Sequence, residues 1–368
     1  VTVSKNMAHY GKNVSDFDAA PWDMVKEACE LVNDSVDFSL YDNDKDGFVD
    51  FVYVVYAGYG EADGGAANTI WPHSYELLDA GVTCMVDGKC VDLYACGNEL
   101  DYYTKHHTGI GTFCHEFSHV LGLPDLYTTE GQTHKTLGSW DILDYGPYNN
   151  DMNTPPAYSA YERFMMGWLT PRLIVEAEDV ELEELQENNS ALLISSTDQH
   201  NLIGNDPKPT TFYLLENRQQ VGWDEYLPGH GLMLTKISYN QRYWSDNSVN
   251  NLSNRMGVDL IEADGKTPSS SEDGYTGKAS DLFPAGATEY LGIKNHSIEE
   301  VSENNRVISF KYKGGRINTA TSEVVLNNDI IVIYDVLGQK MTIKKIEALS
   351  EGTYIVKTTQ GTKKIIIR

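Results

Sequence analysis

The sequence predicts a mixed α/β domain, followed by a mainly β region and a small all-β module. Helical and strand patterns alternate in residues 1–171, short strands separated by turn residues fill residues 172–315, and a further set of strands lies in residues 316–368. The length of 368 residues fits two or three domains, and a hydrophobic content of 41 % is enough to build their cores.

The first region should open with a helix and a buried strand. The helix is expected over residues 21–34, because Pro21 is suited to the first turn and apolar residues recur at helical spacing. These apolar residues are Trp22, Val25, Cys29 and Val32. Residues 48–58 form an almost continuous run of β-branched and aromatic residues, which predicts a buried strand.

Two further helices are expected in the same region. One should run through residues 109–122 and end there, because Gly122 favours a helix terminus and Pro124 cannot continue the helix. The other is expected over residues 156–169, and Pro171 closes the region. We therefore predict that residues 1–171 form the first domain.

The remainder of the chain reads as β structure. Acidic residues crowd positions 176–187, which we interpret as a solvated surface at a domain junction. Strands expected in the second domain, residues 172–315, are 191–195, 211–217, 230–238 and 307–312. Strands expected in the C-terminal module, residues 316–368, are 329–336, 352–358 and 363–368.

The composition excludes some classes of partner. A formal net charge of −26 argues against nucleic acid and anionic membranes, because both carry the same sign of charge. No apolar run approaches the roughly 18 residues that a membrane-spanning helix needs. The polar opening, VTVSKNMAHYGKN, contains no signal peptide, so any export signal is expected to have been removed.

Five cysteines leave at least one thiol unpaired within the chain. The candidate disulfide joins Cys84 to Cys90. A two-residue turn at Asp87-Gly88 would place these cysteines on opposite faces of a hairpin, whereas a three-residue loop would place them opposite each other. The pairing stays open at this stage.

The residues most suited to chemistry lie in the segment HEFSHVLGLPD. On a helix, His115 and His119 project from the same face and can bind one Zn²⁺, with Glu116 placed to take a proton from the bound water. Gly122 allows the chain to turn back, so Asp125 can supply a third ligand. Three protein ligands and one open position are typical of a catalytic zinc site. The alternative is a buried helix whose histidines have only structural partners.

The motif and its surroundings resemble the immune inhibitor A family of secreted bacterial metalloproteases, in which aspartate is the third zinc ligand. The resemblance covers residues 40–285 and is carried by segments 42–65, 70–74, 109–127, 138–149, 155–171 and 213–237. It implies a zincin-like catalytic domain with a mixed sheet and an active-site helix. It also implies that His115, His119 and Asp125 bind zinc and that Glu116 is the general base.

The chain departs from this family in two places. Related catalytic domains carry further strand and helix structure upstream, so residues 1–171 are expected to lack the start of the domain. The turn below the zinc usually holds methionine, where this chain has the nearly isosteric Leu143. In some related zinc peptidases a tyrosine two residues after this methionine contacts the reacting oxyanion. Tyr145 stands at that offset, and we interpret it as a catalytic hydrogen-bond donor or as a tyrosine packed beneath the site.

A second motif, DNDKDGFVD, predicts calcium binding. Its alternating carboxylates resemble the start of an EF-hand loop, although the twelfth position is not glutamate. The expected ligands are Asp42, Asp44, Asp46, the Phe48 carbonyl and Asp50. Four carboxylates packed this closely would repel without a counter-ion. The alternative is an acidic turn before a strand.

The C-terminal residues resemble the sorting domain of type IX secretion in the Bacteroidetes. The resemblance is carried by IVIYDVLGQKM and LSEGTYIVKTTQGTKKIIIR. It implies that the export machinery recognises residues 316–368 as an address, and that the protein is secreted or held at the surface of a Bacteroidetes-like bacterium. The alternative is an ordinary small β module that packs on the enzyme.

These features predict a secreted zinc endopeptidase that hydrolyses protein or peptide substrates with Zn²⁺ and Ca²⁺ as cofactors. A zinc amidase with a non-peptide substrate would use the same chemistry. A non-catalytic, calcium-stabilised adhesin is an alternative of another class, and Glu116 argues against it because a binding protein needs no general base.

Overall fold

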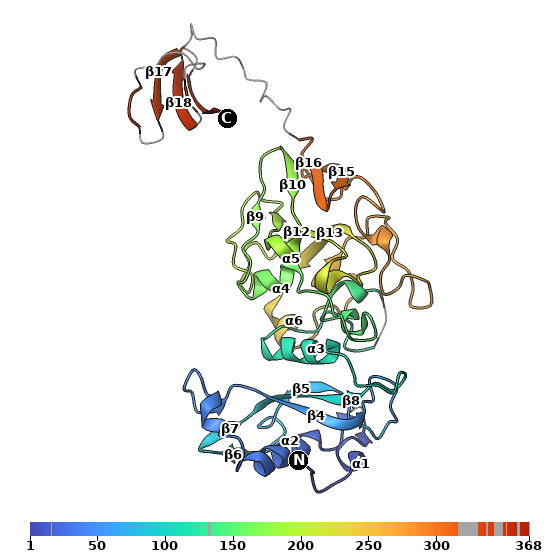
Figure 1. Cartoon of the computed structure of the whole chain (residues 1–368). Coiled ribbons are helices and arrows are strands. Elements are labelled where there is room, and N and C mark those ends of the chain that lie inside the picture. The colour runs from blue at the N-terminus through green and yellow to red at the C-terminus, as the bar shows by residue number, and fades with distance from the viewer. Residues whose placement is uncertain are drawn as a thin grey trace. The chain divides into compact units, whose positions relative to one another are not determined.

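The chain forms a mixed α/β structure in the computed structural model, as expected (Figure 1). The structure describes residues 1–15, 17–131, 134–315, 330–335, 338–341, 349–350, 352–358 and 361–367. It divides into two compact units, residues 1–315 and 316–368. The expected boundary at residue 171 lies inside the first unit, and the division of that unit into two domains remains a prediction.

The N-terminal part of the first unit contains two three-stranded sheets and one two-stranded sheet. Its helices are α1 (Met7–Tyr10), α2 (Pro21–Val32) and the 3₁₀ turn η1 (Phe38–Tyr41). Its strands are β1 (Asn13–Val14), β2 (Phe17–Asp18), β3 (Phe48–Val49), β4 (Val52–Tyr59), β5 (His73–Glu76), β6 (Cys84–Val86), β7 (Lys89–Val91) and β8 (Leu93–Leu100). In the order β4–β8–β5, β8 pairs parallel with β4 and antiparallel with β5. The second sheet has the order β3–β7–β6.

The strand expected over residues 48–58 is divided into β3 and β4. The backbone N–H of Asp50 donates to the Tyr41 carbonyl oxygen, 2.6 Å away, and its carboxylate accepts a hydrogen bond from the backbone N–H of Asn43. Asp50 is therefore bound to the preceding acidic loop, which interrupts the strand.

The hairpin of β6 and β7 has the two-residue turn. Asp87 and Gly88 both have positive φ, 52° and 75°, as a type I′ turn requires. Cys84 consequently lies opposite Val91, while Cys90 lies opposite Met85. The candidate disulfide is not formed, and all five cysteines are free thiols.

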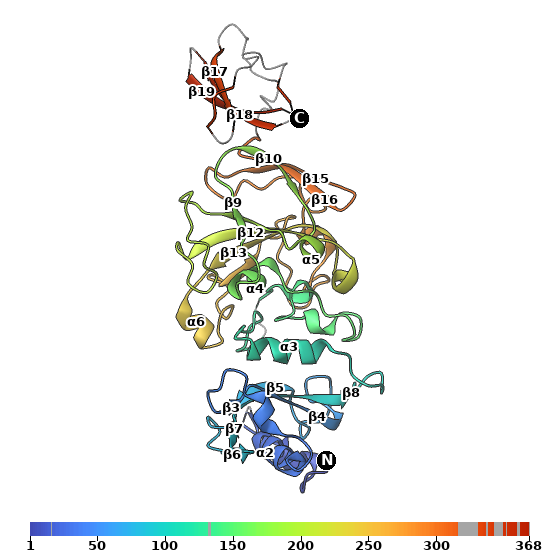
Figure 2. The same cartoon turned by 60° about the vertical axis from the view of Figure 1, so that its left-hand side comes forward.

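The expected helix around the histidine motif is α3 (Gly111–Val120). It lies against the β4–β8–β5 sheet, on the side opposite α2 (Figures 1 and 2). The next expected helix is much shorter than residues 156–169, because α4 (Ala160–Met165) is capped by Ser159 and ends before Gly167, whose φ is 73°. Two 3₁₀ turns connect the helices, η2 (Gly138–Trp140) and η3 (Gly146–Tyr148).

The rest of the first unit is mainly β, as expected. A five-stranded sheet has the order β14–β13–β12–β11–β9, and a three-stranded sheet has the order β10–β16–β15. The strands are β9 (Arg172–Leu173), β10 (Glu178–Leu182), β11 (Leu192–Ile194), β12 (Thr211–Arg218), β13 (Gly231–Ser238), β14 (Val258–Leu260), β15 (Ile298–Asn304) and β16 (Val307–Tyr312). The short helices are α5 (Leu185–Asn188), α6 (Gln241–Ser245), η4 (Gly222–Asp224) and η5 (Ala279–Asp281).

The central strand β12 separates two hydrophobic cores. Phe212 and Leu214 face a core that also contains Tyr161 and Phe164 of α4, whereas Leu215 faces the core shared with the three-stranded sheet. This alternation follows from the two-residue period of a strand. One face of the five-stranded sheet therefore supports the loops and helices that follow α3.

The described part of the second unit is an antiparallel sheet of β17 (Ile330–Asp335), β18 (Gly352–Thr358) and β19 (Gly361–Ile367). Ile333 and Val356 are buried in its small core. The expected strands agree with these elements, although residues 329, 336 and 368 lie outside the described part. Among the described residues, no helix is long and apolar enough to cross a membrane.

Candidate metal centre

The two motif histidines are on one side of α3, because four residues make about one helical turn. The helix begins where Gly111 approaches the backbone of Pro147 so closely that a Cβ atom would lie 1.9 Å from the Pro147 carbonyl oxygen. It is followed by Gly122, whose φ of 89° turns the chain back toward the histidines. Local backbone geometry therefore brings Asp125 beside the helix.

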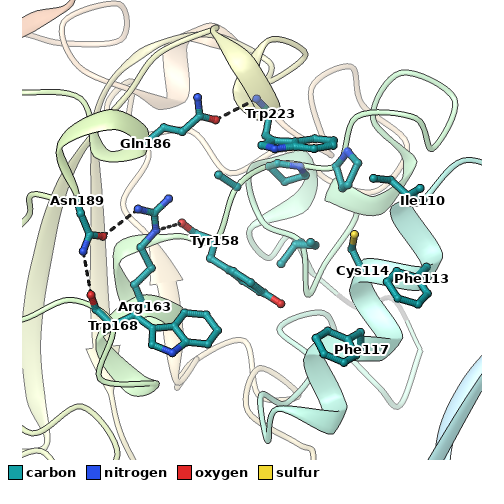
Figure 3. Close-up of a pocket in the computed structure, with 14 residues that line it drawn as sticks. Ile110, Phe113, Cys114, Phe117, Tyr158, Arg163, Trp168, Gln186, Asn189 and Trp223 are labelled. Carbon is teal, nitrogen blue, oxygen red and sulfur yellow. Dashed lines mark hydrogen bonds between the residues drawn. The ribbon is translucent and has the colours of Figure 1, made fainter. Parts of the chain in front are cut away.

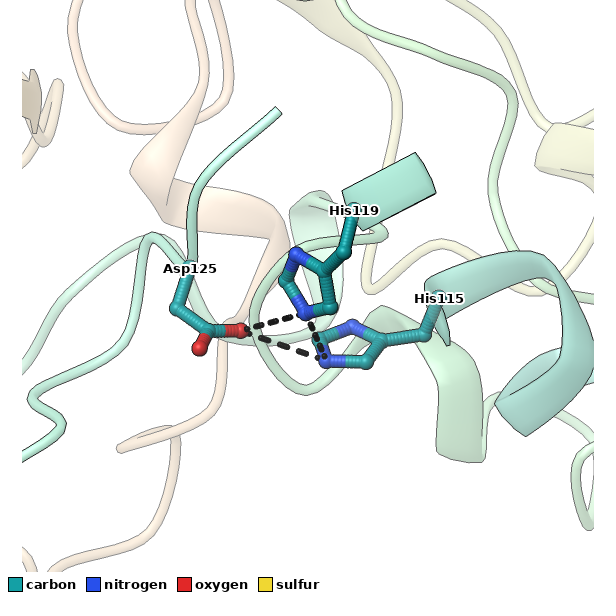
Figure 4. A group of neighbouring side chains, drawn as sticks. All are labelled: His115, His119 and Asp125. Atoms are coloured by element: carbon teal, nitrogen blue, oxygen red, sulfur yellow. Dashed lines mark hydrogen bonds and ion pairs between the residues drawn. The ribbon is translucent and has the colours of Figure 1, made fainter. Parts of the chain in front are cut away.

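The three expected zinc ligands converge in space (Figure 4). Oδ1 of Asp125 lies 3.2 Å from Nε2 of His115 and 3.2 Å from Nε2 of His119. The two Nε2 atoms are 3.3 Å apart. Ligand atoms about 2.0–2.2 Å from a tetrahedral Zn²⁺ are separated by roughly 3.3–3.5 Å, so the three observed distances fit one zinc ion.

The outer nitrogens of both rings are held by backbone carbonyl groups. Nδ1 of His115 lies 2.8 Å from the Ile142 carbonyl oxygen, and Nδ1 of His119 lies 2.8 Å from that of Leu123. A carbonyl oxygen only accepts hydrogen bonds, so each Nδ1 carries a proton. This arrangement orients both rings and presents their Nε2 atoms to a metal.

The charge at the site also fits a cation. Burial alone would raise the pKa of Asp125, but the two histidines hold that pKa below its ordinary value. Burial would lower the pKa of His115, and Asp125 instead raises it to about 9. The buried carboxylate therefore requires a positive charge beside it. A proton on a histidine ring or a metal ion can supply that charge, and the two compete for the same site. Oδ1 of Asp125 is buried and faces both histidine Nε2 atoms, as expected of an atom that would bind a metal together with them.

Glu116 lies next to the first histidine and is 6 % exposed. Burial raises the pKa of its carboxyl group, and the charges of His115 and His119 partly offset that rise. A raised pKa makes a carboxylate a better proton acceptor near neutral pH. The environment of Glu116 is thus suited to a general base.

The loop below the histidines contains Leu143 and Tyr145. Leu143 is buried, and its carbonyl oxygen accepts a hydrogen bond from the Leu126 backbone N–H at 2.8 Å. Tyr145 is half-buried, with its ring centre 5.9 Å from that of Tyr148. Leu143 is therefore a buried packing residue, while the catalytic role of Tyr145 remains a prediction.

Two residues near the site were missed by the sequence analysis. The ring of Tyr127 lies nearly parallel to that of His115, with their centres 6.2 Å apart. The side chain of Asn247 is hydrogen-bonded to Asp125. Tyr127 follows the motif closely enough to have been considered, whereas Asn247 is 122 positions from its partner and no local pattern indicates it.

The acidic loop brings together three of its four predicted carboxylates. Oxygen atoms of Asp42, Asp44 and Asp50 lie within 4.8 Å of one another. The carboxylate of Asp46 is not part of this group and instead accepts a hydrogen bond from the Phe48 N–H at 2.8 Å.

A lysine side chain outside the loop, from β7, places a positive charge beside these carboxylates, which the sequence analysis did not anticipate. Nζ of Lys89 is 2.5 Å from Oδ2 of Asp42, and it lowers the pKa of that carboxyl group. The repulsion among the loop carboxylates, from which calcium binding was predicted, is therefore partly relieved by Lys89. Calcium binding remains a prediction.

If the loop binds calcium, millimolar Ca²⁺ should raise the melting temperature of the zinc-loaded protein, because a ligand of the folded state stabilises it. Asp44→Asn should abolish the increase, whereas Asp79→Asn, an exposed change outside the loop, should leave it intact. Differential scanning calorimetry measures the shift. Equal melting temperatures with and without Ca²⁺ would show that the loop is only an acidic turn.

Part of the chain is similar in sequence to known metalloproteases. Residues 1–169 match the family described as immune inhibitor A peptidase M6, catalytic domain. Immune inhibitor A of Bacillus thuringiensis subsp. alesti is 27 % identical over 163 residues, which cover 38 % of this chain and 23 % of the relative. Pre-pro-metalloprotease PrtV of Vibrio cholerae serotype O1 is 27 % identical over 212 residues, or 50 % of this chain and 23 % of the relative. The chain is thus homologous to M6 metalloproteases over less than a quarter of their length.

Proposed function

We propose that this protein is a zinc-dependent endopeptidase that hydrolyses peptide bonds in proteins. The observation that carries the proposal is the convergence of His115, His119 and Asp125 at separations suited to zinc, with Glu116 adjacent. Homology to M6 metalloproteases supports a metal-dependent peptidase.

A zinc ion held by these ligands would supply a Lewis acid that lowers the pKa of water to about 7 and polarises the scissile carbonyl. Glu116 would accept a proton from the attacking water and deliver it to the leaving amine. The Ile142 and Leu123 carbonyl groups would hold the histidine rings in orientation during both transfers. Asp125 would contribute the negative charge that retains the cation.

Two alternatives use the same residues differently. A zinc amidase would share the metal and the base but act on a non-peptide substrate. A calcium-stabilised adhesin would have no use for a buried glutamate beside two histidines, so the environment of Glu116 favours an enzyme. Digestion of a peptide library separates the endopeptidase from the two alternatives, because only the endopeptidase cleaves it.

Replacing the proposed base should separate metal binding from catalysis. Glu116→Gln should retain about one zinc per chain and lower kcat by at least about 100-fold, since general-base catalysis contributes about 10²–10⁴-fold. His119→Ala should lose both the zinc and the activity. Metal analysis and peptide hydrolysis measure the two effects. Full activity in purified Glu116→Gln would contradict the mechanism.

Tyr145 is the proposed oxyanion donor, and Tyr127 provides the comparison. Tyr145→Phe should lower kcat by roughly 100-fold with KM nearly unchanged, as expected for a donor that acts in the transition state. Tyr127→Phe should change kcat by only a few-fold. Steady-state kinetics of both variants test this assignment, and the reverse result would transfer the role to Tyr127.

We also propose that the protein is secreted or surface-exposed and that residues 316–368 are the address recognised by the export machinery. The tail's resemblance to a type IX sorting domain supports this role, and the separate compact unit is compatible with it. Export in the native host should therefore fail when this unit is deleted, and normal export of the shortened chain would refute the role.

A further inference from the structure

Asn247 contacts the third metal ligand from a distant part of the chain. It follows α6 and has the left-handed conformation, with φ of 49°, which asparagine tolerates well. Its Oδ1 accepts a hydrogen bond from the backbone N–H of Asp125 at 2.7 Å. Its Nδ2 donates to Oδ2 of the same aspartate, also at 2.7 Å.

These two hydrogen bonds fix both the backbone and the carboxylate of Asp125. Because Oδ2 is bound to the amide of Asn247, the carboxylate is held with Oδ1 toward the two histidine Nε2 atoms, 3.2 Å away. We infer that Asn247 is a positioning residue that orients Asp125 for binding a divalent metal through one oxygen. This inference rests on the proposed function and extends it to a residue outside the segment matched by the family.

An amide is chemically suited to this role. Its N–H group satisfies Oδ2 without neutralising Asp125, so the carboxylate keeps its negative charge for the cation. A lysine or arginine in the same place would compete with the metal for that charge. Partners of this kind, which hydrogen-bond a ligating carboxylate, tune metal affinity by orienting the ligand.

Neighbouring asparagines hold the same loop at other points. Nδ2 of Asn250 donates to the Leu126 carbonyl oxygen at 2.8 Å. Oδ1 of Asn251 accepts from the backbone N–H of Thr129 at 2.8 Å, and its Nδ2 donates to the Thr129 hydroxyl at 2.9 Å. Asn251 therefore anchors the loop by two bonds, as Asn247 does, but through Thr129 and not through Asp125. It provides a matched control.

The test compares zinc affinity in two variants of the full chain. Asn247→Gly removes the amide while permitting positive φ, and Asn251→Ala removes the neighbouring anchor. Competition with a chromophoric chelator measures the zinc dissociation constant, and calorimetry of the metal-free proteins measures their stability. Asn247→Gly should bind zinc about 10–100-fold more weakly than the unsubstituted chain, the usual effect of losing such a partner. Asn251→Ala should change the constant by less than about 3-fold on the same reasoning.

The outcomes distinguish this inference from the proposal on which it rests. Unchanged zinc affinity in Asn247→Gly would overturn the positioning role. Equal weakening in both variants would also overturn it, because general anchoring of the loop would then explain the effect. Metal-free stability that falls equally in both variants, with weaker zinc binding only in Asn247→Gly, supports the inference. If the unsubstituted chain binds no zinc, the proposed function itself fails.

Discussion

The structure of the site depends on the carboxylate of Asp125, which is buried between two histidines and one asparagine. Its Oδ1 lies 3.2 Å from each histidine Nε2 atom, and its Oδ2 is hydrogen-bonded to Asn247. A buried carboxylate is costly unless it is paired or coordinates a cation, so this position needs a positive partner. The surrounding elements are arranged to bring that partner and the carboxylate together.

The β-rich half of the first unit contributes to the site through a chain of contacts. The sheet supports α4, whose Tyr161 hydroxyl accepts a 2.5 Å hydrogen bond from Nε1 of Trp244 in α6. Asn247 follows two residues after α6 ends, so packing in the core determines where its amide lies. A second contact between the two halves is made by Lys135, whose Nζ is 2.9 Å from Oδ2 of Asp281. The site thus extends beyond residues 1–169, which match the family.

Local sequence patterns were sufficient to predict the helix and the three side chains that converge beside it. The spacing of His115 and His119 determines that they share a helical face, and Gly122 permits the return of the chain toward Asp125. Patterns of alternation and turn residues also predicted four of the eight strands of the β-rich region, namely β11, β12, β13 and β16. In each case the relevant interactions lie within a few residues of one another.

Interactions between distant residues were not predictable from the same patterns. Asn247 has no local signature, and Lys89 neutralises Asp42 from a strand that is 47 positions away. Arg218 is fully buried and paired with Glu216 and Asp224, although charged residues usually lie at the surface. Such contacts are set by tertiary packing, which a single sequence does not display.

We propose above that His115, His119 and Asp125 together hold one catalytic zinc ion. Anomalous diffraction at the zinc edge, from crystals of the zinc-loaded protein, tests this claim most directly. We expect one zinc within about 2.0–2.2 Å of both Nε2 atoms and of Oδ1 of Asp125, with a further position free of protein ligands. Zinc bound elsewhere, or at this site through four protein ligands, would contradict it.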